Sequence, residues 1–406
     1  MSKKDILIAA QKILDGGIEL VNDPFTGEQM TTAVRDRDEA LLKPLEKALQ
    51  IDGLIGRYAK QGAHVFEHGF IAFQVGTVAH WILLRSLQVG EPEKIVDQLY
   101  RVLKRNSAEC YAIFALQGIK TTHRVNLSKG ISLVPFEDVP AGNWKEILLR
   151  RVRPFLPLSP GKPTSAIVFK FRQDPLFIQN KAKWDTGKSL INRSLVDDTL
   201  RALTLVGPSA PVVIMEWNGY KANFPYSQPG VARWSMHELN PEAMPTVIPS
   251  LDTKLAMKVT KAFLGLNSDR KQLLRIPLQR LALSVRRRTL ADKAIELGIA
   301  LEALLAGDRS HHDPVSHLVR LRGALLHGGT LAEKKRVYRL LRDVYTLRSK
   351  AVHVGHIAER EKVNGRKQKT EEILAGGATE CAFLIRKWMG LTDLPNWDDV
   401  MLDTRL

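Results

Sequence analysis

The sequence contains few cysteines and no long apolar run, and both absences limit what the protein can be. Cys110 and Cys381 are the only cysteines in 406 residues. They predict buried thiols in a reducing compartment, not a disulfide framework or a zinc site. The most apolar window, residues 70–84, is too short to span a bilayer, and the N-terminus has no signal-peptide pattern. We therefore expect a cytoplasmic protein with no membrane partner.

Acidic residues are scarce relative to basic ones. The chain has 60 Lys and Arg against 43 Asp and Glu, a formal net charge of +17 and an isoelectric point of about 9.8. This balance favours a polyanionic partner, of which nucleic acid is the commonest, although simply solvated lysines and arginines are the alternative. A hydrophobic content of 44% is ordinary for a globular protein, so wholesale disorder is not expected.

Two proline-rich stretches, residues 153–163 and 224–250, interrupt the chain and predict its organisation. Apolar periodicity before the second stretch predicts helices at 4–21, 38–50, 92–104 and 194–206, and strands within 110–134 and at 166–171 and 211–217. After it, helices are predicted at 251–264, 269–288, 290–306, 314–327, 331–353 and 370–389. The fold class is therefore an α+β region, residues 1–250, followed by an all-α helical region, residues 251–406.

The helix predicted at 331–353 carries the pattern on which the functional argument depends. At about 100° per residue, one stripe is apolar and predicts the core face: Val337, Leu340, Leu341, Val344, Leu347 and Ala351. The opposite side carries Tyr338, Arg342, Tyr345, Ser349 and His353. Such side chains suit contact with another chain, or with stacked bases and phosphate, better than water alone. Gly355 ends the helix.

Arg348 lies at the border of the apolar stripe, where a guanidinium normally has a carboxylate partner. The candidate partner is Glu302, which lies beside the apolar stripe of the helix predicted at 290–306. A half-buried carboxylate facing another helix should be paired. We therefore predict an ion pair between Glu302 and Arg348.

The segment RSKAVH, with Arg348 and His353 five residues apart near a helix end, resembles the R-x4-6-H signature of HEPN-domain proteins. LGIALEALLAGDRS, LVRLRGALLHG and VYRLLRDVYTLRSKAVHVG, in this order, are similar in particular to the Apea-like HEPN family of prokaryotic proteins. The resemblance covers roughly residues 270–390, and a weaker likeness lies at YAIFALQGIKTTHRVNLSKGISLVPF.

The resemblance implies a HEPN-like helical bundle that forms a homodimer through its C-terminal helices, so that two Arg/His pairs line one cleft. It also implies endoribonuclease activity without a metal or other cofactor, in prokaryotic defence against phage or in growth arrest. Arg348, His353 and Ser349 match the motif positions, and Glu302 matches the acidic position of the earlier helix. Related toxins often carry a tyrosine two residues after the histidine. Gly355 stands there instead, so regulation through that tyrosine is not expected.

The chemistry of these residue types agrees with RNA cleavage. RNA supplies its own nucleophile, the 2′-hydroxyl, so cleavage needs a base, an acid and positive charge on the phosphate. Histidine can take or deliver the proton, and arginine can form two parallel hydrogen bonds to phosphate oxygens. The expected products are a 2′,3′-cyclic phosphate and a 5′-hydroxyl. Residues five apart on a straight helix point ~140° from each other, so a dimer mate or a loosened helix must bring the pair together.

Further basic and aromatic residues predict contacts with an RNA substrate such as tRNA or mRNA. They are Arg342, Tyr345 and Lys350 on the helix, and Arg360, Lys362, Arg366, Lys367 and Lys369 in a predicted loop at 356–370. A solvated, mobile hinge explains that loop equally well. Arg320 and Arg322 either line the cleft or lie on a solvated helix face. The run from Arg286 to Arg288 is either an anion contact or a helix C-terminus that exploits its dipole.

Two alternatives remain open from the sequence. In one, Arg348 only pairs with Glu302, His353 caps a helix end, and the chain is a non-catalytic module that binds RNA or protein. In the other, the chain is a structural domain of a larger defence assembly. A further motif is set aside: residues 64–68, HVFEH, match the H-x-x-E-H string of inverted zinc proteases. Gly62 and Gly69 bracket that string and would break the helix it needs, so local packing is the favoured interpretation. The N-terminal region is expected to sense a phage-derived or host activator, or to recruit substrate.

Overall fold

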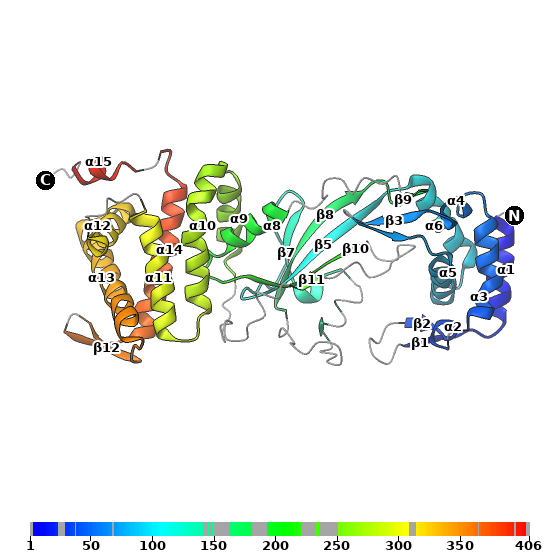
Figure 1. Ribbon diagram of the computed structural model, residues 1–406, viewed down its shortest axis with the longest axis horizontal. Helices are drawn as coiled ribbons and strands as arrows, with labels where there is room; N and C mark the ends of the chain where they lie inside the picture. The colour runs from blue at the N-terminus through cyan, green and yellow to red at the C-terminus, as the bar shows by residue number, and fades with distance from the viewer. Residues whose placement is uncertain are drawn as a thin grey trace.

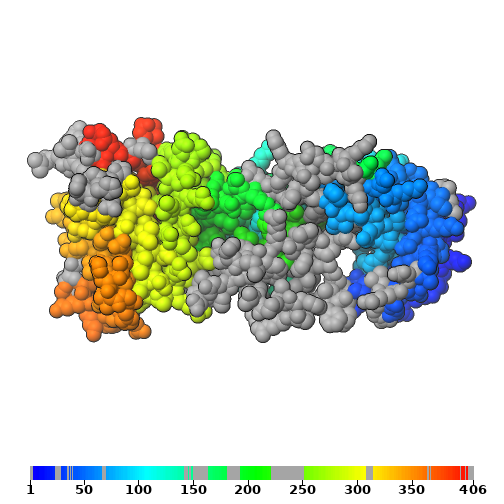
Figure 2. All heavy atoms as spheres, in the orientation of Figure 1, coloured from blue at the N-terminus to red at the C-terminus, as the bar shows by residue number. Residues whose placement is uncertain are grey.

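The computed structural model of this chain describes residues 3–22, 29–36, 38–66, 69–140, 145, 148–149, 163–180, 193–220, 233–234, 251–307, 314–363, 365–393 and 395–402. The molecule is elongated, with helices at both ends and a β-sheet between them (Figure 1). The space-filling view shows the same order of regions along the long axis (Figure 2). The N-terminal region mixes strands with helices and the C-terminal region is helical, so the coarse fold class predicted from the sequence is confirmed.

Helices and short strands form the N-terminal end of the molecule. Its elements are α1 (Lys3–Asp15), β1 (Leu20–Asn22), β2 (Gln29–Thr31), α2 (Thr32–Arg35), α3 (Glu39–Ile51), α4 (Gly56–Ala59), β3 (Ala63–Phe66), β4 (Gly69–Ala72), α5 (Val75–Val89) and α6 (Pro92–Arg105). The helix predicted at 4–21 ends at Asp15, because Gly17 has a φ of 85°, which turns the chain out of the helix. Ile6, Leu45, Ile82 and Leu99 belong to the core that these helices share.

The central sheet has six strands in the order β11-β10-β5-β8-β7-β6, and all its pairs are antiparallel. Its elements are β5 (Ala108–Gln117), β6 (Val125–Ser128), β7 (Ile131–Pro135), η1 (Phe136–Asp138), β8 (Ser165–Gln173), β10 (Val212–Tyr220) and β11 (Arg233–Trp234); β9 (Phe177–Ile178) instead pairs with β3. Side chains alternate between the faces of β5: Phe114 belongs to the cluster that includes the C-terminal helices, and Ile113 to the other face.

Helices α8 (Arg193–Leu203) and α9 (Thr253–Leu264) connect the sheet to the C-terminal helices. The C-terminal region consists of α10 (Ser268–Arg286), α11 (Leu290–Leu305), α12 (Val315–His327), α13 (Leu331–Val354), β12 (Arg360–Val363), β13 (Arg366–Lys369), α14 (Thr370–Met389) and α15 (Trp397–Leu402). The bounds of α9 to α14 agree with the predicted helices to within two residues, whereas α15 was not predicted. The region is not all-α as predicted, since β12 and β13 form a hairpin.

The largest hydrophobic cluster runs from the sheet into the C-terminal helices without a break at residue 250. It includes Phe114 of β5, Phe263 of α9 and Leu341 of α13. The two proline-rich stretches lie almost wholly outside the described residues, so the domain division at 250 stays a prediction. Among the described residues, no helix combines the length and apolar character that a membrane crossing needs. Cys110 and Cys381 are both buried and free, and burial raises the pKa of each thiol to about 12.

The HVFEH segment is not a helical metal motif in its described part. His64 lies on strand β3, buried against the rings of Phe177 and Tyr220 at centroid distances of 5.3 and 5.5 Å. Its Nε2 also forms a hydrogen bond with the Tyr220 hydroxyl. Burial lowers the pKa of His64 to about 3. The prediction of local packing is therefore confirmed for His64, while Glu67 and His68 lie outside the described residues.

The burial of His64 predicts acid sensitivity. An unfolded histidine has a pKa near ~6.5, whereas that of folded His64 is about 3, so stability is complete above pH ~6.5 and is lost as the pH falls towards 3. We expect the free energy of unfolding of the wild type to fall by about 1 kcal/mol per pH unit below pH ~6 from this group. Urea unfolding of the His64→Phe variant between pH 7 and 4 should lack this slope, while the exposed-site variant His317→Gln should keep it. An unchanged slope in His64→Phe would contradict the assignment.

Candidate functional site

Helix α13 has the amphipathic form that its sequence predicts. Thr330 is the N-cap residue of a capping box: its hydroxyl accepts from the Glu333 backbone amide at 3.3 Å, and its own backbone amide donates to the Glu333 carboxylate at 2.7 Å. The amide hydrogen bond from Thr330 lowers the pKa of the Glu333 carboxyl. The buried residues are Val337, Leu341, Val344, Leu347 and Ala351, with Leu340 partly buried. The helix ends where Gly355 adopts a φ of 73°.

The predicted ion pair between α11 and α13 is present. The Arg348 Nη2 atom lies 3.2 Å from Glu302 Oε1, and both side chains are about one quarter exposed. The Tyr345 hydroxyl donates to the same carboxylate oxygen at 2.9 Å. The Arg348 guanidinium also lies over the Tyr345 ring, 5.4 Å from its centroid. Tyr345, predicted to contact another chain or RNA, thus also contacts Glu302 and Arg348 of its own chain and helps to fix the position of Arg348.

Gly298 of α11 provides the space that Arg348 occupies. A Cβ atom added at Gly298 would lie 2.5 Å from Arg348 Cγ and 3.2 Å from its Cβ. The first distance is shorter than carbon atoms can pack, and the second is tight. Glu302 follows Gly298 by one helical turn, so the two residues lie on one face of α11. The guanidinium is thus held by a carboxylate and a ring, while the aliphatic part of the Arg348 side chain packs against Gly298.

This packing predicts that alanine substitutions at two helical glycines change the free energy of unfolding in opposite directions. We expect Gly298→Ala to lower the free energy of unfolding by about 1–3 kcal/mol, because the new methyl group displaces the Arg348 side chain. Gly376 of α14 is the matched control, since its added Cβ would meet only Leu340 Cδ1 at 3.6 Å. Gly376→Ala should stabilise the protein by about 0.5–1 kcal/mol through helix propensity. Urea unfolding measures both, and equal effects of the same sign would contradict the crowding at Gly298.

A cavity of about 470 Å³ lies beside this ion pair, between α12 and α13. Its lining residues are Ser316, Arg320, Arg342, Tyr345, Thr346, Ser349, Lys350 and His353. The structure therefore gathers His353 and Ser349 with three of the predicted RNA-binding residues. Tyr345 contacts both the cavity and the ion pair, whereas Arg348 does not line the cavity.

Three cationic side chains that line the cavity already contact other groups of the protein. Arg320 donates from Nε to the Ser316 carbonyl at 2.7 Å and lies 5.3 Å from the Tyr338 ring centroid. The Arg342 Nε atom is 3.5 Å from Asp343. Lys350 donates to both oxygens of Glu361 at 2.7 Å, which lowers the pKa of that carboxyl. The cavity surface is thus basic, but its lysine would have to leave a carboxylate to reach phosphate.

Arg348 and His353 are not brought together within one chain. Both lie on one continuous helix, α13, so the ~140° between positions five apart applies. Arg348 faces α11, whereas His353 is exposed in the last turn and lines the cavity on the α12 side. Among the contacts of the described residues, none joins these two side chains. A shared phosphate would therefore need either a second copy of α13 or a local loosening of this helix between the two residues.

The segment predicted as a basic loop, residues 356–370, is instead the hairpin β12–β13, which lies beyond the end of α13 (Figure 1). The prediction of a loop was wrong because it overlooked Asn364–Gly365, a dipeptide typical of two-residue hairpin turns. Buried Val363 and Ile357 fix the hairpin to the core. Arg360, Lys362, Lys367 and Lys369 are exposed on it, and Lys369 lies 3.0 Å from Glu372. The side chain of Arg366 lies outside the described part.

Of the two arginines Arg320 and Arg322 of α12, the first lines the cavity and the second does not. Arg320 lines the cavity with Ser316, as one of the two sequence interpretations proposes. Arg322 is 5% exposed, donates to the Leu305 carbonyl at 2.9 Å and lies against Trp397, so neither the cleft nor a solvated face describes it. Ser316 and Thr346 were missed because small hydroxyl side chains carry no periodic signal.

Comparison with protein-family models, with curated proteins and with solved structures found no match to this chain.

Proposed function

We propose that this chain is a metal-independent endoribonuclease of the HEPN type. The observation that carries the proposal is the position of Arg348, held by Glu302 and Tyr345 beside a basic cavity that contains His353 and Ser349. A guanidinium fixed by a carboxylate and a ring is oriented before a ligand arrives, which is what stabilisation of a phosphate transition state requires. The residues in these positions are those that the family resemblance assigns.

In the proposed reaction, RNA provides its 2′-hydroxyl as the nucleophile. His353 takes the proton of that hydroxyl or delivers one to the leaving 5′-oxygen. Arg348 binds the phosphate oxygens as the phosphorus becomes five-coordinate. Ser349 lies beside His353 in the cavity and can hold a phosphate oxygen or the attacking hydroxyl by a hydrogen bond. The products are a 2′,3′-cyclic phosphate and a 5′-hydroxyl.

The proposed active form is a homodimer formed through the C-terminal helices. Val352 and Val354, on either side of His353, are 50% and 65% exposed, which favours a surface covered by another chain. A two-fold axis near the end of α13 would bring Arg348 of one copy towards His353 of the other. Arg342, Tyr345 and Lys350 in the cavity, and Arg360, Lys362, Lys367 and Lys369 on the hairpin, would then contact the backbone of a tRNA or mRNA.

The proposed setting is a cytoplasmic defence against phage or a related growth-arrest response. In it, residues 1–250 recognise a phage-derived or host activator or recruit the RNA. The elongated shape places helices α1–α6 of that region at the far end from α13 (Figure 1), so an activator bound there would act through the sheet and α8–α9 and not by touching the site directly.

The test is cleavage of a purified tRNA and mRNA pool by the full-length protein in EDTA. We expect cleaved RNA with 5′-hydroxyl ends, detected by labelling with polynucleotide kinase without prior phosphatase treatment. Fragments with 5′-phosphate ends, or activity that EDTA abolishes, would contradict the proposed chemistry.

A second candidate function is a non-catalytic module that dimerises and binds RNA or protein. It is favoured by one observation, that Arg348 faces α11 and does not line the cavity of its own chain. In this case the intact dimer should bind RNA without cutting it, and substitution of His353 should change neither binding nor growth of cells that express the protein.

A further inference from the structure

The cavity between α12 and α13 extends along helix α13. Arg342 and His353 both line it, and they lie eleven residues apart on this continuous helix, so their Cα atoms are about 16 Å apart. Thr346 and Ser349 line the cavity between them. The four residues follow each other at steps of four, three and four positions, which places them in one row on the helix surface. The cavity is therefore an elongated groove with His353 at one end.

Arg320 of α12 lies at the end of this groove that is opposite His353. Its guanidinium lies over the Tyr338 ring, 5.3 Å from the ring centroid, and its Nε atom donates to the Ser316 carbonyl at 2.7 Å. Tyr338 precedes His353 by fifteen residues, which is about 22 Å along α13. Arg320 and His353 are therefore too far apart to bind the same phosphate.

The positive charge of Arg320 is not balanced within the described part of the chain. A ring and a carbonyl hold this partly buried guanidinium, and no carboxylate among the described residues pairs with it. The other cations of the groove have anionic neighbours. Lys350 donates to both oxygens of Glu361 at 2.7 Å, and the Arg342 Nε atom lies 3.5 Å from Asp343. Arg320 is thus the position in the groove that favours an anion from outside the protein.

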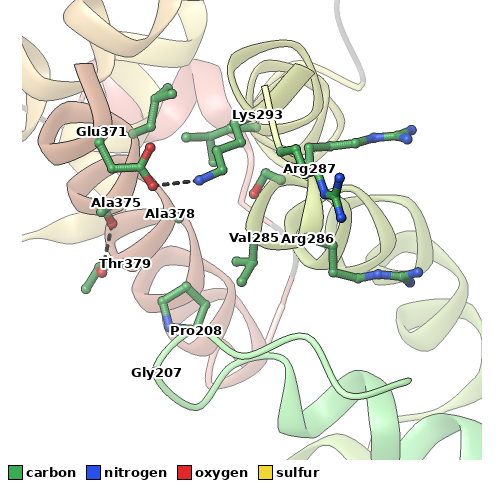
Figure 3. Close-up of a pocket in the computed structure, with 14 residues that line it drawn as sticks. Gly207, Pro208, Val285, Arg286, Arg287, Lys293, Glu371, Ala375, Ala378 and Thr379 are labelled. Carbon is green, nitrogen blue, oxygen red and sulfur yellow. Dashed lines mark hydrogen bonds and ion pairs between the residues drawn. The ribbon is translucent and has the colours of Figure 1, made fainter. Parts of the chain in front are cut away.

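The larger cavity of the C-terminal helices differs in this respect. It has a volume of about 690 Å³ and lies among α10, α11, α14 and the turn between α8 and β10 (Figure 3). Lys293 reaches Glu371 there, with its Nζ atom 2.6 Å from Oε1 (Figure 3). Arg287 pairs with buried Glu296 at 2.7 Å, and the two other arginines that line this cavity also have partners. Its cations therefore do not call for a bound anion as Arg320 does.

The dimensions of the groove suit a single strand of nucleic acid. A basic groove with an aromatic side chain is the usual arrangement for binding such a strand, and Tyr345 lines this one between Arg342 and His353. A volume of about 470 Å³ between two helices is too small for a duplex, whose major groove alone is wide enough to admit an α-helix. Successive phosphates of a stacked strand are about 3.4 Å apart along its axis, so a strand in the groove presents more than one phosphate to the protein.

We propose that this groove binds one strand of RNA, with the scissile phosphate at His353 and a second phosphate of the same strand at Arg320. The substrate is then single-stranded RNA of several nucleotides. Arg320 is a substrate-binding residue that determines which phosphodiester lies at His353. The cleavage step in this proposal rests on the proposed function, whereas the binding of the strand does not.

Binding of an RNA that cannot be cleaved tests the groove separately from the reaction. The probe is a labelled 2′-O-methyl oligouridylate of about eight nucleotides, which lacks the 2′-hydroxyl nucleophile, and fluorescence anisotropy measures its affinity for the full-length protein. We expect Arg320→Gln to weaken binding by about tenfold. The slope of log affinity against log salt concentration should become less steep by about 0.7, the contribution of one phosphate contact of a single strand.

Arg101 of α6 provides the matched control for Arg320. Its Nε atom also donates to the carbonyl four residues earlier, that of Asp97, at 3.4 Å, and α6 lies at the other end of the molecule (Figure 1). Arg101→Gln should therefore change neither the affinity nor its dependence on salt. An equal loss in both variants would mean that total charge, and not a phosphate contact at Arg320, supports binding, and would contradict the proposal.

A second variant tests the groove without altering Arg320. Thr346 is exposed in the middle of the groove, so Thr346→Glu places a negative charge in the path of the strand and should weaken binding by about tenfold. Ala332→Glu adds the same charge at an exposed position of α13 outside the groove and should not. Thermal unfolding establishes that each variant is folded. Unchanged affinity in folded Arg320→Gln or Thr346→Glu, or a duplex of the same length that binds as tightly as the single strand, would overturn the proposal.

Cleavage distinguishes the two phosphates of the strand. With unmodified oligouridylate of the same length, Arg320→Gln should lower kcat/KM by about tenfold, mainly through KM, because the contact is made equally before and during the reaction. With the dinucleotide UpU, which has one phosphodiester, the variant should match the wild type. Equal losses on both substrates would place Arg320 at the scissile phosphate and contradict the proposal. If no RNA is cut while the binding results hold, the strand-binding groove is supported and the proposed nuclease activity is not.

Discussion

Replacing His353 by alanine is expected to reduce RNA cleavage by about 10²–10⁴-fold, the usual contribution of a general acid or base. The side chain is exposed in the last turn of α13, so its removal should leave the melting temperature of the protein and its affinity for RNA nearly unchanged. Single-turnover cleavage of a labelled tRNA measures the rate of the chemical step, and filter binding of the same RNA measures the affinity.

His356 provides the matched control for this experiment. It is also exposed, and it lies three residues further on, after Gly355 has ended the helix. His356→Ala should therefore keep the cleavage rate of the wild type. Equal losses in the two variants would mean that positive charge near the hairpin, and not acid–base chemistry at His353, supports the activity. No loss in either variant would favour the non-catalytic module.

Helices α9 to α14 could be predicted from the sequence because they combine a regular apolar stripe with a clear end. In α13 the stripe from Val337 to Ala351 repeats every three to four residues, and Gly355 ends the helix. The pairing of Arg348 with Glu302 could also be predicted. A cation at the border of one apolar stripe and an anion at the border of another are both partly buried when the two helices pack. Because a buried charge without a partner is costly, the two side chains are expected to pair.

Other features of the site could not be predicted in this way. A helical pattern says which side of a helix is polar, but not which neighbour that side meets. Tyr345 therefore lies on the side predicted to meet another chain or RNA, yet its hydroxyl reaches Glu302 of its own chain at 2.9 Å. The role of Gly298 depends on an atom of another helix, Arg348 Cγ, and no pattern within α11 contains it. The hairpin β12–β13 had a local signal, Asn364–Gly365, which the many charges around it obscured.

Replacing Arg348 by alanine is expected to reduce cleavage by about 10²–10³-fold, the usual effect of removing one group that stabilises a developing negative charge. Arg348→Lys should not restore the rate, because an ammonium group lacks the planar pair of N–H donors that binds two phosphate oxygens at once. The loss of the ion pair with Glu302, in which both side chains are about one quarter exposed, should cost about 1 kcal/mol of stability. Single-turnover cleavage and urea unfolding measure the two effects. A variant that loses activity only in proportion to its unfolded fraction would contradict the proposed role.

The direction of the two side chains on α13 allows a stricter test of the same prediction. Because Arg348 faces α11 and His353 faces the cavity, a site that uses both should take them from different copies. An equal mixture of Arg348→Ala and His353→Ala chains, unfolded and refolded together, should then recover about a quarter of the wild-type activity. Half of the dimers are mixed, and each mixed dimer has one of its two composite sites intact. If both residues served one site from the same chain, every site in the mixture would lack one group and no activity would return. Recovery therefore separates a composite site from a helix that loosens to bring its own Arg348 and His353 together.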